Sequence, residues 1–308
     1  MTITVNGGLT GSGNTARMLQ EGLNAVTNTE YKDYEPEYVK ILEVLKSKKA
    51  YEEDVPFATT GLANQKPEGQ QIEYDAMQEG QKKRYNHIVY ALGMIISDEA
   101  IRDNLYLDLV TKGGAALKRS LVHTEEQIAA NLFNNGYSSS LLWDGLSIFN
   151  DSHKLIKGGT YSNVLATPSD LSEASLEDAI INVEDFRDDA GLIISAKVQT
   201  LHIPRQLRFV AERILGSTLQ NDTASNAINA LSKTGSVPGG YHVNHRFTDA
   251  DNWFLRTDVP DGGKFFRRYD HEFAQDNDFG TSNFRYKGAT RFSVGVTDGR
   301  QYYGSGQV

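Results

Sequence analysis

The sequence predicts an α+β fold, and three observations predict it. Residues 98–135 carry apolar side chains at helical spacing over an unusually long stretch. Residues 175–215 follow an order of helix, glycine, strand, proline and helix. From Tyr241 onward the chain is rich in aromatic and β-branched residues, in runs that turn residues separate. Helices and strands that are segregated along the chain in this way indicate α+β architecture rather than alternating α/β units.

The composition bounds the function. A chain of 308 residues can bury one large core or two modest ones. The absence of cysteine excludes disulfides, thiolate metal sites and cysteine nucleophiles. No apolar run reaches the roughly 20 residues of a membrane helix, and the N-terminal residues resemble no secretory signal, so we expect a cytosolic protein. The net charge of −9 argues against gripping nucleic acid, but not against enclosing it.

The first 97 residues have little that could form a core of their own. Residues 15–26 predict a helix, and residues 38–49 are a mixture of apolar and polar side chains, so residues 1–50 are interpreted as an arm with short local elements. In residues 51–97, glycine and proline punctuate the first part, and an aromatic, β-branched run follows. This pattern predicts a long exposed β-hairpin, which is a natural arm for reaching a neighbouring subunit.

Residues 98–135 predict the longest helix. Asp98 is a candidate N-cap, Gly136 a candidate for the C′ position, and the length would be roughly 55 Å. Gly113 and Gly114 are expected to weaken the middle of this helix.

The segment that follows predicts alternating elements. A helix is expected over residues 176–190, with Ser175 and Asp178 forming a capping box and Gly191 ending it. A strand over residues 196–204 should close at Pro204, and a helix over 205–215 should end at Gly216. Residues 217–240 predict a surface loop around a short helix, and the long strands after Tyr241 should turn at residues 249–251 and 261–263.

Asp151, Ser152 and His153 are the residue types of a serine hydrolase, side by side. A catalytic triad needs three side chains that converge on one point, whereas adjacent residues point in different directions. The chain also has no G-x-S-x-G elbow. We therefore expect a turn after a strand-like run at residues 146–149, and not a catalytic site.

Three further motifs have an ordinary explanation. Residues 7–15 are glycine-rich but lack the Lys-Ser/Thr ending of a P-loop, and residues 270–280 are acidic but lack the ligand spacing of an EF-hand. Arginines among aromatic residues near the C-terminus could stack on single-stranded nucleic acid, yet in an acidic chain they favour a subunit interface. The sequence thus predicts no enzyme, no cofactor and no metal site.

The order of these features resembles the major head subunit of Mu-like tailed bacteriophages, which have the Hong Kong 97-type capsid fold. That family typically has an aromatic-Asp-Gly before a Leu/Ile-Phe and then a histidine. The matching residues are Trp143, Asp144, Gly145, Ile148, Phe149 and His153, preceded by Tyr90, Ile96-Ser97 and Asp103-Asn104, and followed by the segments 252–255 and 283–287. The resemblance covers nearly the whole chain and implies that Trp143, Asp144, Gly145, Phe149 and His153 are a structural signature.

The resemblance also implies a domain organisation. Residues 1–50 would be an N-terminal arm and 51–97 an extended β-hairpin loop. Residues 98–172 would form a peripheral domain with a spine helix at 98–135, and residues 173–255 an axial domain around the five- and six-fold axes. Residues 256–308 would return as strands of the peripheral domain and end in an axial segment.

In function, the resemblance implies a major capsid protein that self-assembles into hexamers and pentamers of an icosahedral head enclosing double-stranded DNA. The expected location is the virion, after assembly in the host bacterial cytoplasm. Expected partners are other copies of the chain, a portal, a separate scaffold, and a maturation protease or decoration protein; no membrane is involved. The candidate contacts between subunits are Lys66, Tyr74, Arg84, Arg267 and Arg268. Crosslinking through Lys66, Lys82 or Lys83 is not expected, because no catalytic glutamate can be assigned.

Three rival hypotheses remain. An encapsulin-like compartment would have the same fold with a cargo enzyme inside. A hydrolase would use Ser152 and His153. A DNA-contacting virion protein would bind DNA tightly and in a salt-sensitive manner.

Overall fold

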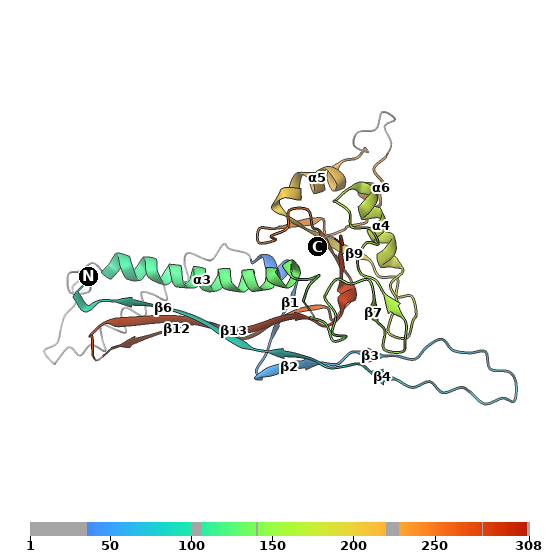
Figure 1. The fold of residues 1–308 in the computed structure, drawn as a ribbon, viewed down its shortest axis with the longest axis horizontal. Helices are drawn as coiled ribbons and strands as arrows, with labels where there is room; N and C mark the ends of the chain where they lie inside the picture. The colour runs from blue at the N-terminus through green and yellow to red at the C-terminus, as the bar shows by residue number, and fades with distance from the viewer. Residues whose placement is uncertain (1–35, 100–105, 140, 220–227, 279, 307–308) are drawn as a thin grey trace.

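The computed structural model describes residues 36–99, 106–139, 141–219, 228–278 and 280–306. A long helix and a long sheet extend to one side of the molecule, a second sheet with short helices lies above their inner end, and a thin hairpin projects to the opposite side (Figure 1). The two main sheets have four strands each. The mixture of helices and segregated strands confirms the predicted α+β class.

The first sheet is built mostly from the C-terminal strands. Its order is β1-β12-β13-β6, with β1 parallel to β12 and the other pairs antiparallel. Side chains alternate in burial along β13, because successive residues of a strand point to opposite faces. The strands are β1 (Glu43–Lys46), β12 (Gly263–Asn277), β13 (Phe284–Val296) and β6 (Ile88–Ile96).

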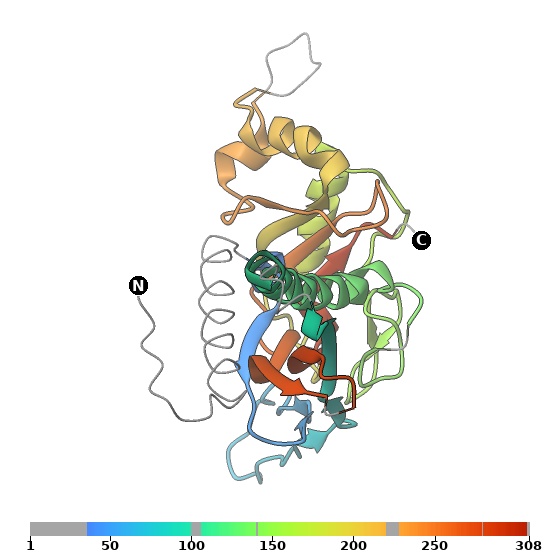
Figure 2. The same ribbon diagram turned by 90° about the vertical axis from the view of Figure 1, so that its left-hand side faces the viewer.

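The helix α3 (Tyr106–Asn134) lies along one face of this sheet, as the view along its axis shows (Figure 2). It ends where the sequence predicts, whereas the proposed start at Asp98 borders residues 100–105, outside the described part. Its inner end packs into an aromatic core with Phe133, Phe149, Phe254 and Tyr302. Gly136 follows the helix in the predicted position but without the left-handed backbone of a typical C′ glycine. A side chain there would meet the ring of Phe149 at 2.7 Å, so close packing requires the glycine.

The second sheet has the order β10-β9-β11-β14 and carries its own core around Trp253, Leu176 and Leu201. Its last strand, β14, follows β12 and β13 of the first sheet in the chain. The C-terminal part of the chain therefore contributes strands to both sheets. The elements are α4 (Glu173–Glu184), β9 (Val198–Pro204), the 3-10 turn η2 (Arg205–Leu207), α5 (Arg208–Gly216), α6 (Ala230–Thr234), β10 (Tyr241–Asn244), β11 (Phe254–Thr257), the 3-10 turn η3 (Gly299–Gln301) and β14 (Tyr302–Gly304).

Two predicted boundaries in this region are corrected and two are confirmed. The helix expected over 176–190 is α4, which begins three residues earlier and ends at Glu184. Its capping box joins Ser172 to Ser175, and not Ser175 to Asp178, because the Ser172 hydroxyl already accepts from the backbone N–H of Ser175. The strand that closes at Pro204 and the helix that ends at Gly216 are confirmed.

The paired strands of the hairpin are shorter than the sequence predicts. Strand β2 (Tyr51–Asp54) pairs with β5 (Lys83–Asn86), and β3 (Phe57–Ala58) pairs with β4 (Gln78–Glu79). Residues 59–77 belong to no strand and form the projecting end (Figure 1). Residues 88–96, expected in the hairpin, instead pair along their whole length with β13. Strand β6 pairs with β13 because its apolar side chains pack against α3, a long-range contact that the local sequence pattern does not reveal.

The boundary of the expected arm is also corrected. The turn η1 (Glu37–Lys40) and β1 place Tyr38, Ile41 and Leu42 in the aromatic core, so residues 36–46 are part of the folded body. The helix expected over residues 15–26 lies outside the described residues. None of the described helices is long and apolar enough to cross a bilayer.

Candidate functional site

The segment from Trp143 to His153 forms a loop that follows α3 in the chain and is buried at residues 147–149 and at His153. The strand expected at residues 146–149 is not formed; these residues lie in bends, and only His153 enters a short strand, β7 (His153–Lys154), paired with β8 (Thr160–Tyr161). Ile148 and Phe149 are buried in the aromatic core. Gly145 has φ of +79°, a backbone conformation that favours glycine, and it ends the turn that presents Asp144.

Asp144 and His153 form a buried pair that holds this loop closed. His153 Nδ1 lies 2.8 Å from Asp144 Oδ2, and both side chains are almost fully buried. Burial alone would raise the pKa of Asp144, but hydrogen bonds from His153 and from the Leu146 backbone N–H outweigh it and lower that pKa. His153 Nε2 lies 3.2 Å from the carbonyl oxygen of Ile148, which also accepts from Asn163 Nδ2. Both ring nitrogens therefore face protein oxygens.

The geometry contradicts a hydrolytic triad. The Ser152 hydroxyl donates to Asp151 Oδ1 at 2.5 Å on the exposed side of the turn, while His153 is buried and turned toward Asp144. A general base must reach the nucleophile's proton, and this histidine has both nitrogens engaged elsewhere. Asp151, Ser152 and His153 are turn and core residues.

A column of buried polar groups continues from this loop into the second sheet. The ring of His153 stacks on Tyr161, and the guanidinium of Arg300 lies 5.5 Å from the centre of the Tyr161 ring. Arg300 binds Asp298 at 2.7 Å and Asp189 at 2.8 Å. Sequence reasoning missed Arg300 and Asp189, because nothing local marks two residues 111 positions apart as partners. The column ties the loop, η3 and the segment after α4 into one rigid unit.

A second buried cluster joins α3 to the sheet beneath it. Glu125 binds Arg267 at 2.8 Å and Thr290 at 3.0 Å, and His271 Nε2 lies 3.1 Å from its carboxylate. Burial alone would raise the pKa of Glu125, but His271 and Arg267 outweigh it and lower that pKa. Because buried charges are tolerated only with partners, this cluster sets the position of the helix on the sheet.

The neighbouring Glu126 is buried in a different environment. Its Oε1 accepts from the backbone N–H of Glu37 at 2.7 Å, whereas Oε2 lies 3.7 Å from Arg246 Nη1 and makes no hydrogen bond. Burial raises the pKa of Glu126 to about 7. This carboxyl stands where η1, α3 and the segment after β10 meet, and the sequence pattern had not singled it out.

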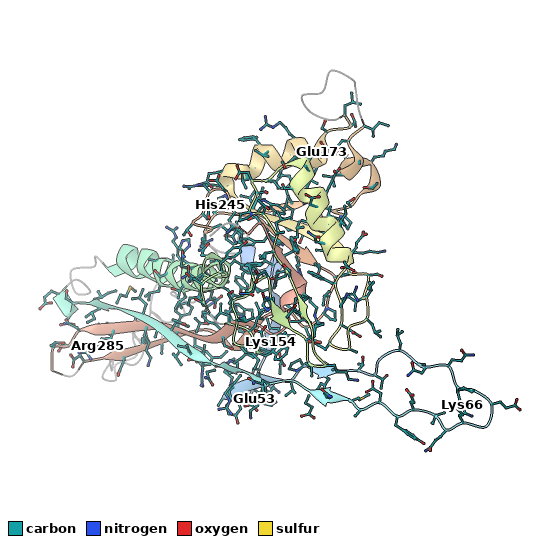
Figure 3. The ribbon with its side chains drawn as sticks, turned by 45° about the vertical axis from the view of Figure 1, so that its right-hand side comes forward. Glu53, Lys66, Lys154, Glu173, His245 and Arg285 are labelled. Carbon is teal, nitrogen blue, oxygen red and sulfur yellow. The ribbon has the colours of Figure 1, made fainter. Side chains whose placement is uncertain are left out.

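The predicted contact residues lie in different places. Lys66 and Tyr74 are on the projecting hairpin, with Lys66 near its tip (Figure 3). Arg84 is at the hairpin base, where it pairs with Glu53, and Arg268 is half-buried on β12. Arg267 points into the subunit, because its guanidinium binds Glu125 and the hydroxyl of Tyr38, at 2.6 Å. A contact of Arg267 with a neighbouring subunit stays a prediction.

Large apolar side chains are exposed on the hairpin and along β6. Leu62 is 81% exposed, Tyr74 80% and Met77 73%. A folded chain that works alone seldom presents so many apolar groups on one projecting segment. The described residues contain no group of three or more histidine, aspartate or glutamate side chains that could hold a metal ion. The features that stand out are therefore surfaces for contact and buried groups for rigidity.

Comparisons with known proteins agree with this description. A family model described as "Phage capsid protein" matches residues 81–304. The capsid of a native GTA particle has a TM-score of 0.54 at 12% identity, covering 87% of this chain and 88% of that one. A virus-like particle from Pyrococcus furiosus has a TM-score of 0.52 at 10% identity, covering 94% and 98%. The capsid of Myoviridae phage XM1 has a TM-score of 0.51 at 8% identity, covering 97% and 99%. None of the curated protein sequences compared with the chain matches it.

The matched residues include α3, both main sheets apart from β1, and the whole buried loop from Trp143 to His153. At these identities the solved structures show the shared Hong Kong 97-type fold, and the family model shows the family. The chain therefore belongs to the phage capsid protein family, as a structural major capsid protein that is built in many copies into the shell of the virion.

Proposed function

We propose that this subunit forms hexamers and pentamers of an icosahedral head that encloses double-stranded DNA. The observation that carries the proposal is the projecting hairpin (Figure 1), on which the large apolar side chains of Leu62, Tyr74 and Met77 are 73–81% exposed. A hairpin on one side and an open sheet edge on the other make contacts that join unlike surfaces of two copies. Such head-to-tail contacts close into rings when the rotation between copies allows it.

The domain roles follow from the same arrangement. Residues 51–86 act as the extended loop, and α3 with the sheet β1-β12-β13-β6 acts as a peripheral domain. The sheet β10-β9-β11-β14, with α4 to α6, acts as the axial domain around the symmetry axes. The signature residues Trp143, Asp144, Gly145, Phe149 and His153 lock the junction between these two domains. This role is supported by the buried pair of Asp144 and His153.

The contents and partners of the shell are part of the proposal. The net charge of −9 suits a container that holds DNA without adhering to it. Assembly in the host bacterial cytoplasm with a portal, a separate scaffold, and a maturation protease or decoration protein rests on the family resemblance.

The experiment that tests the proposal is assembly of the chain expressed alone. Light scattering after size exclusion and negative-stain microscopy should show rings, tubes or closed shells. If the chain stays monomeric, co-expression with the scaffold candidate from neighbouring genes must restore assembly. A monomer under both conditions contradicts the proposal.

An encapsulin-like shell is the second candidate, because the virus-like particle from Pyrococcus furiosus has a TM-score of 0.52 with this chain. The two functions differ in content. Shells from a native source that hold DNA support the phage head, whereas shells that hold a single enzyme and no DNA support the compartment.

A further inference from the structure

Strand β6 is an unprotected edge of the first sheet. In the described part of the chain it pairs only with β13, which leaves the backbone groups of its other side available. Its sequence, IVYALGMII, contains no charged residue and no proline, the usual protection of an edge. Ile88, Val89, Leu92 and Ile95 are between 49% and 64% exposed. An edge of this kind is a template for an added strand.

The two faces of the sheet differ beside this edge. On the face toward α3, Met94 packs with Ile96 and the helix residue Leu117, so this side is apolar. On the other face, β13 places Arg285 opposite Ile95 and Lys287 opposite Gly93. An added strand would therefore meet apolar side chains on one face and basic side chains on the other.

Lys287 is the basic residue best placed to reach a new strand. Its cross-strand partner on β12 is Ala274, whereas the partner of Arg285 is Asp276. On its other side stands Gly93, which has no side chain; a Cβ there would lie 3.9 Å from the Cβ of Lys287. The lysine can therefore extend across β6 toward its open edge.

The returning part of the hairpin has the matching pattern. In residues 70–76, Ile72, Tyr74 and Ala76 alternate with Glu73 and Asp75. In an extended strand this alternation puts the apolar residues on one face and the acidic residues on the other. Seven residues span about 23 Å at about 3.3 Å each, which fits within the nine residues of β6.

We propose that residues 70–76 of a neighbouring copy add to the edge of β6 as a fifth strand of the sheet. Tyr74 then packs beside Leu92 on the face of α3, and Glu73 faces Lys287 on the other. The inference rests on the proposed assembly into a shell and names the surface that receives the hairpin. A subunit does not receive its own hairpin, because Lys66 at the tip and Arg285 on the sheet lie at opposite ends of the molecule (Figure 3).

Introduced cysteines test this pairing directly, because the native chain has none. Leu92→Cys is combined in one chain with Tyr74→Cys or with the milder Ala76→Cys, and particles are assembled under reducing conditions and checked by microscopy. After mild oxidation, a non-reducing gel should show a ladder of crosslinked subunits for at least one pair. The matched control is Leu92→Cys with Glu73→Cys, which faces the opposite side of the strand and should crosslink at least ten-fold less.

The other outcomes are distinguishable. Assembled particles without any ladder overturn the strand addition and leave the proposed assembly intact. Dimers from Leu92→Cys alone show that two β6 edges pair with each other and also overturn it. A wild-type chain that forms no particles, with or without scaffold, counts against the proposed function itself.

Discussion

The imidazole of His153 lies between the carboxylate of Asp144, 2.8 Å from Nδ1, and the carbonyl oxygen of Ile148, 3.2 Å from Nε2. Histidine and aspartate, which suggest catalysis in the sequence, thus form a contact that closes a loop. Both ring nitrogens lie within hydrogen-bond distance of protein oxygens, so the ring has its polar partners inside the subunit. The pair closes a loop whose residues Ile148 and Phe149 are part of the aromatic core, and we propose that it holds the relative position of the two sheets.

Replacement of His153 should destabilise the subunit strongly. His153→Phe keeps a ring beside Tyr161 but leaves the Asp144 carboxylate buried without its partner, which typically costs about 3–5 kcal/mol. Urea unfolding of the unassembled subunit measures this loss. Ser152→Ala is the control and should stay within about 0.5 kcal/mol of wild type, because Ser152 is exposed. Equal stability of the two variants would contradict the structural role of His153.

Glu126 should make the subunit less stable as the pH rises. Its pKa in the folded state is raised to about 7, so the folded chain holds the proton more tightly than the unfolded chain. This stabilisation is complete below the unfolded pKa near 4.5 and is lost as the pH rises through about 7. Glu126→Gln should therefore be more stable than wild type at pH 8, by roughly 1–3 kcal/mol, and show little gain near pH 4.5.

The adjacent Glu125 is the control, because its effect on the stability of the subunit should change with pH in the opposite direction. Its pKa is lowered in the folded state, so its stabilisation is present above the unfolded pKa and is lost as the pH falls. Glu125→Gln should destabilise the subunit at pH 8 and do so less at pH 4.5. Urea unfolding of both variants across this range checks the pair, and parallel pH profiles would refute the assignment.

Gly136 should not tolerate a side chain. Gly136→Ala would place a Cβ 2.7 Å from the Phe149 ring and 3.0 Å from the carbonyl oxygen of Phe133, which forces the aromatic core to shift. Overpacking of this kind typically costs about 1–3 kcal/mol. Gly61→Ala is the matched control, since its nearest neighbour would be a side-chain oxygen at 3.6 Å. A wild-type melting temperature for Gly136→Ala would show that the core is looser than the contacts indicate.

The sequence predicted those elements whose pattern is local. The end of α3, the strand closed by Pro204 and the helix ended by Gly216 were found from periodicity and stop signals. The start of α4 was placed too late, because Ser172 and Ser175 form a capping box without the acidic residue that usually reveals one. A capping box with serine instead of glutamate at the third helical position, as at Ser175, is hard to recognise in a sequence.

Features that depend on distant partners were not predictable in this way. Strand β6 resembles the second arm of a hairpin by composition, yet its partner β13 begins almost 190 residues later. The Glu125 cluster draws on residues 38, 267, 271 and 290, which no local pattern connects. The signature from Trp143 to His153 was found through its resemblance, and its buried pair only through the fold. Long-range pairing, rather than local propensity, decides these positions.

The hairpin should matter to assembly and not to the fold of the subunit. Tyr74 is 80% exposed in its own subunit, so Tyr74→Ser should leave the free energy of unfolding within about 0.5 kcal/mol of wild type. The proposed contact buries the same ring against a neighbour in the shell, and loss of a buried aromatic side chain costs about 1.5–3 kcal/mol per contact. Since every copy makes this contact, the concentration needed for assembly should rise at least ten-fold, as light scattering can measure. Gln65→Ser, an exposed polar change on the same hairpin, should assemble like wild type. If Tyr74→Ser assembles normally, the ring remains in solvent within the shell and the hairpin holds its neighbour by other residues.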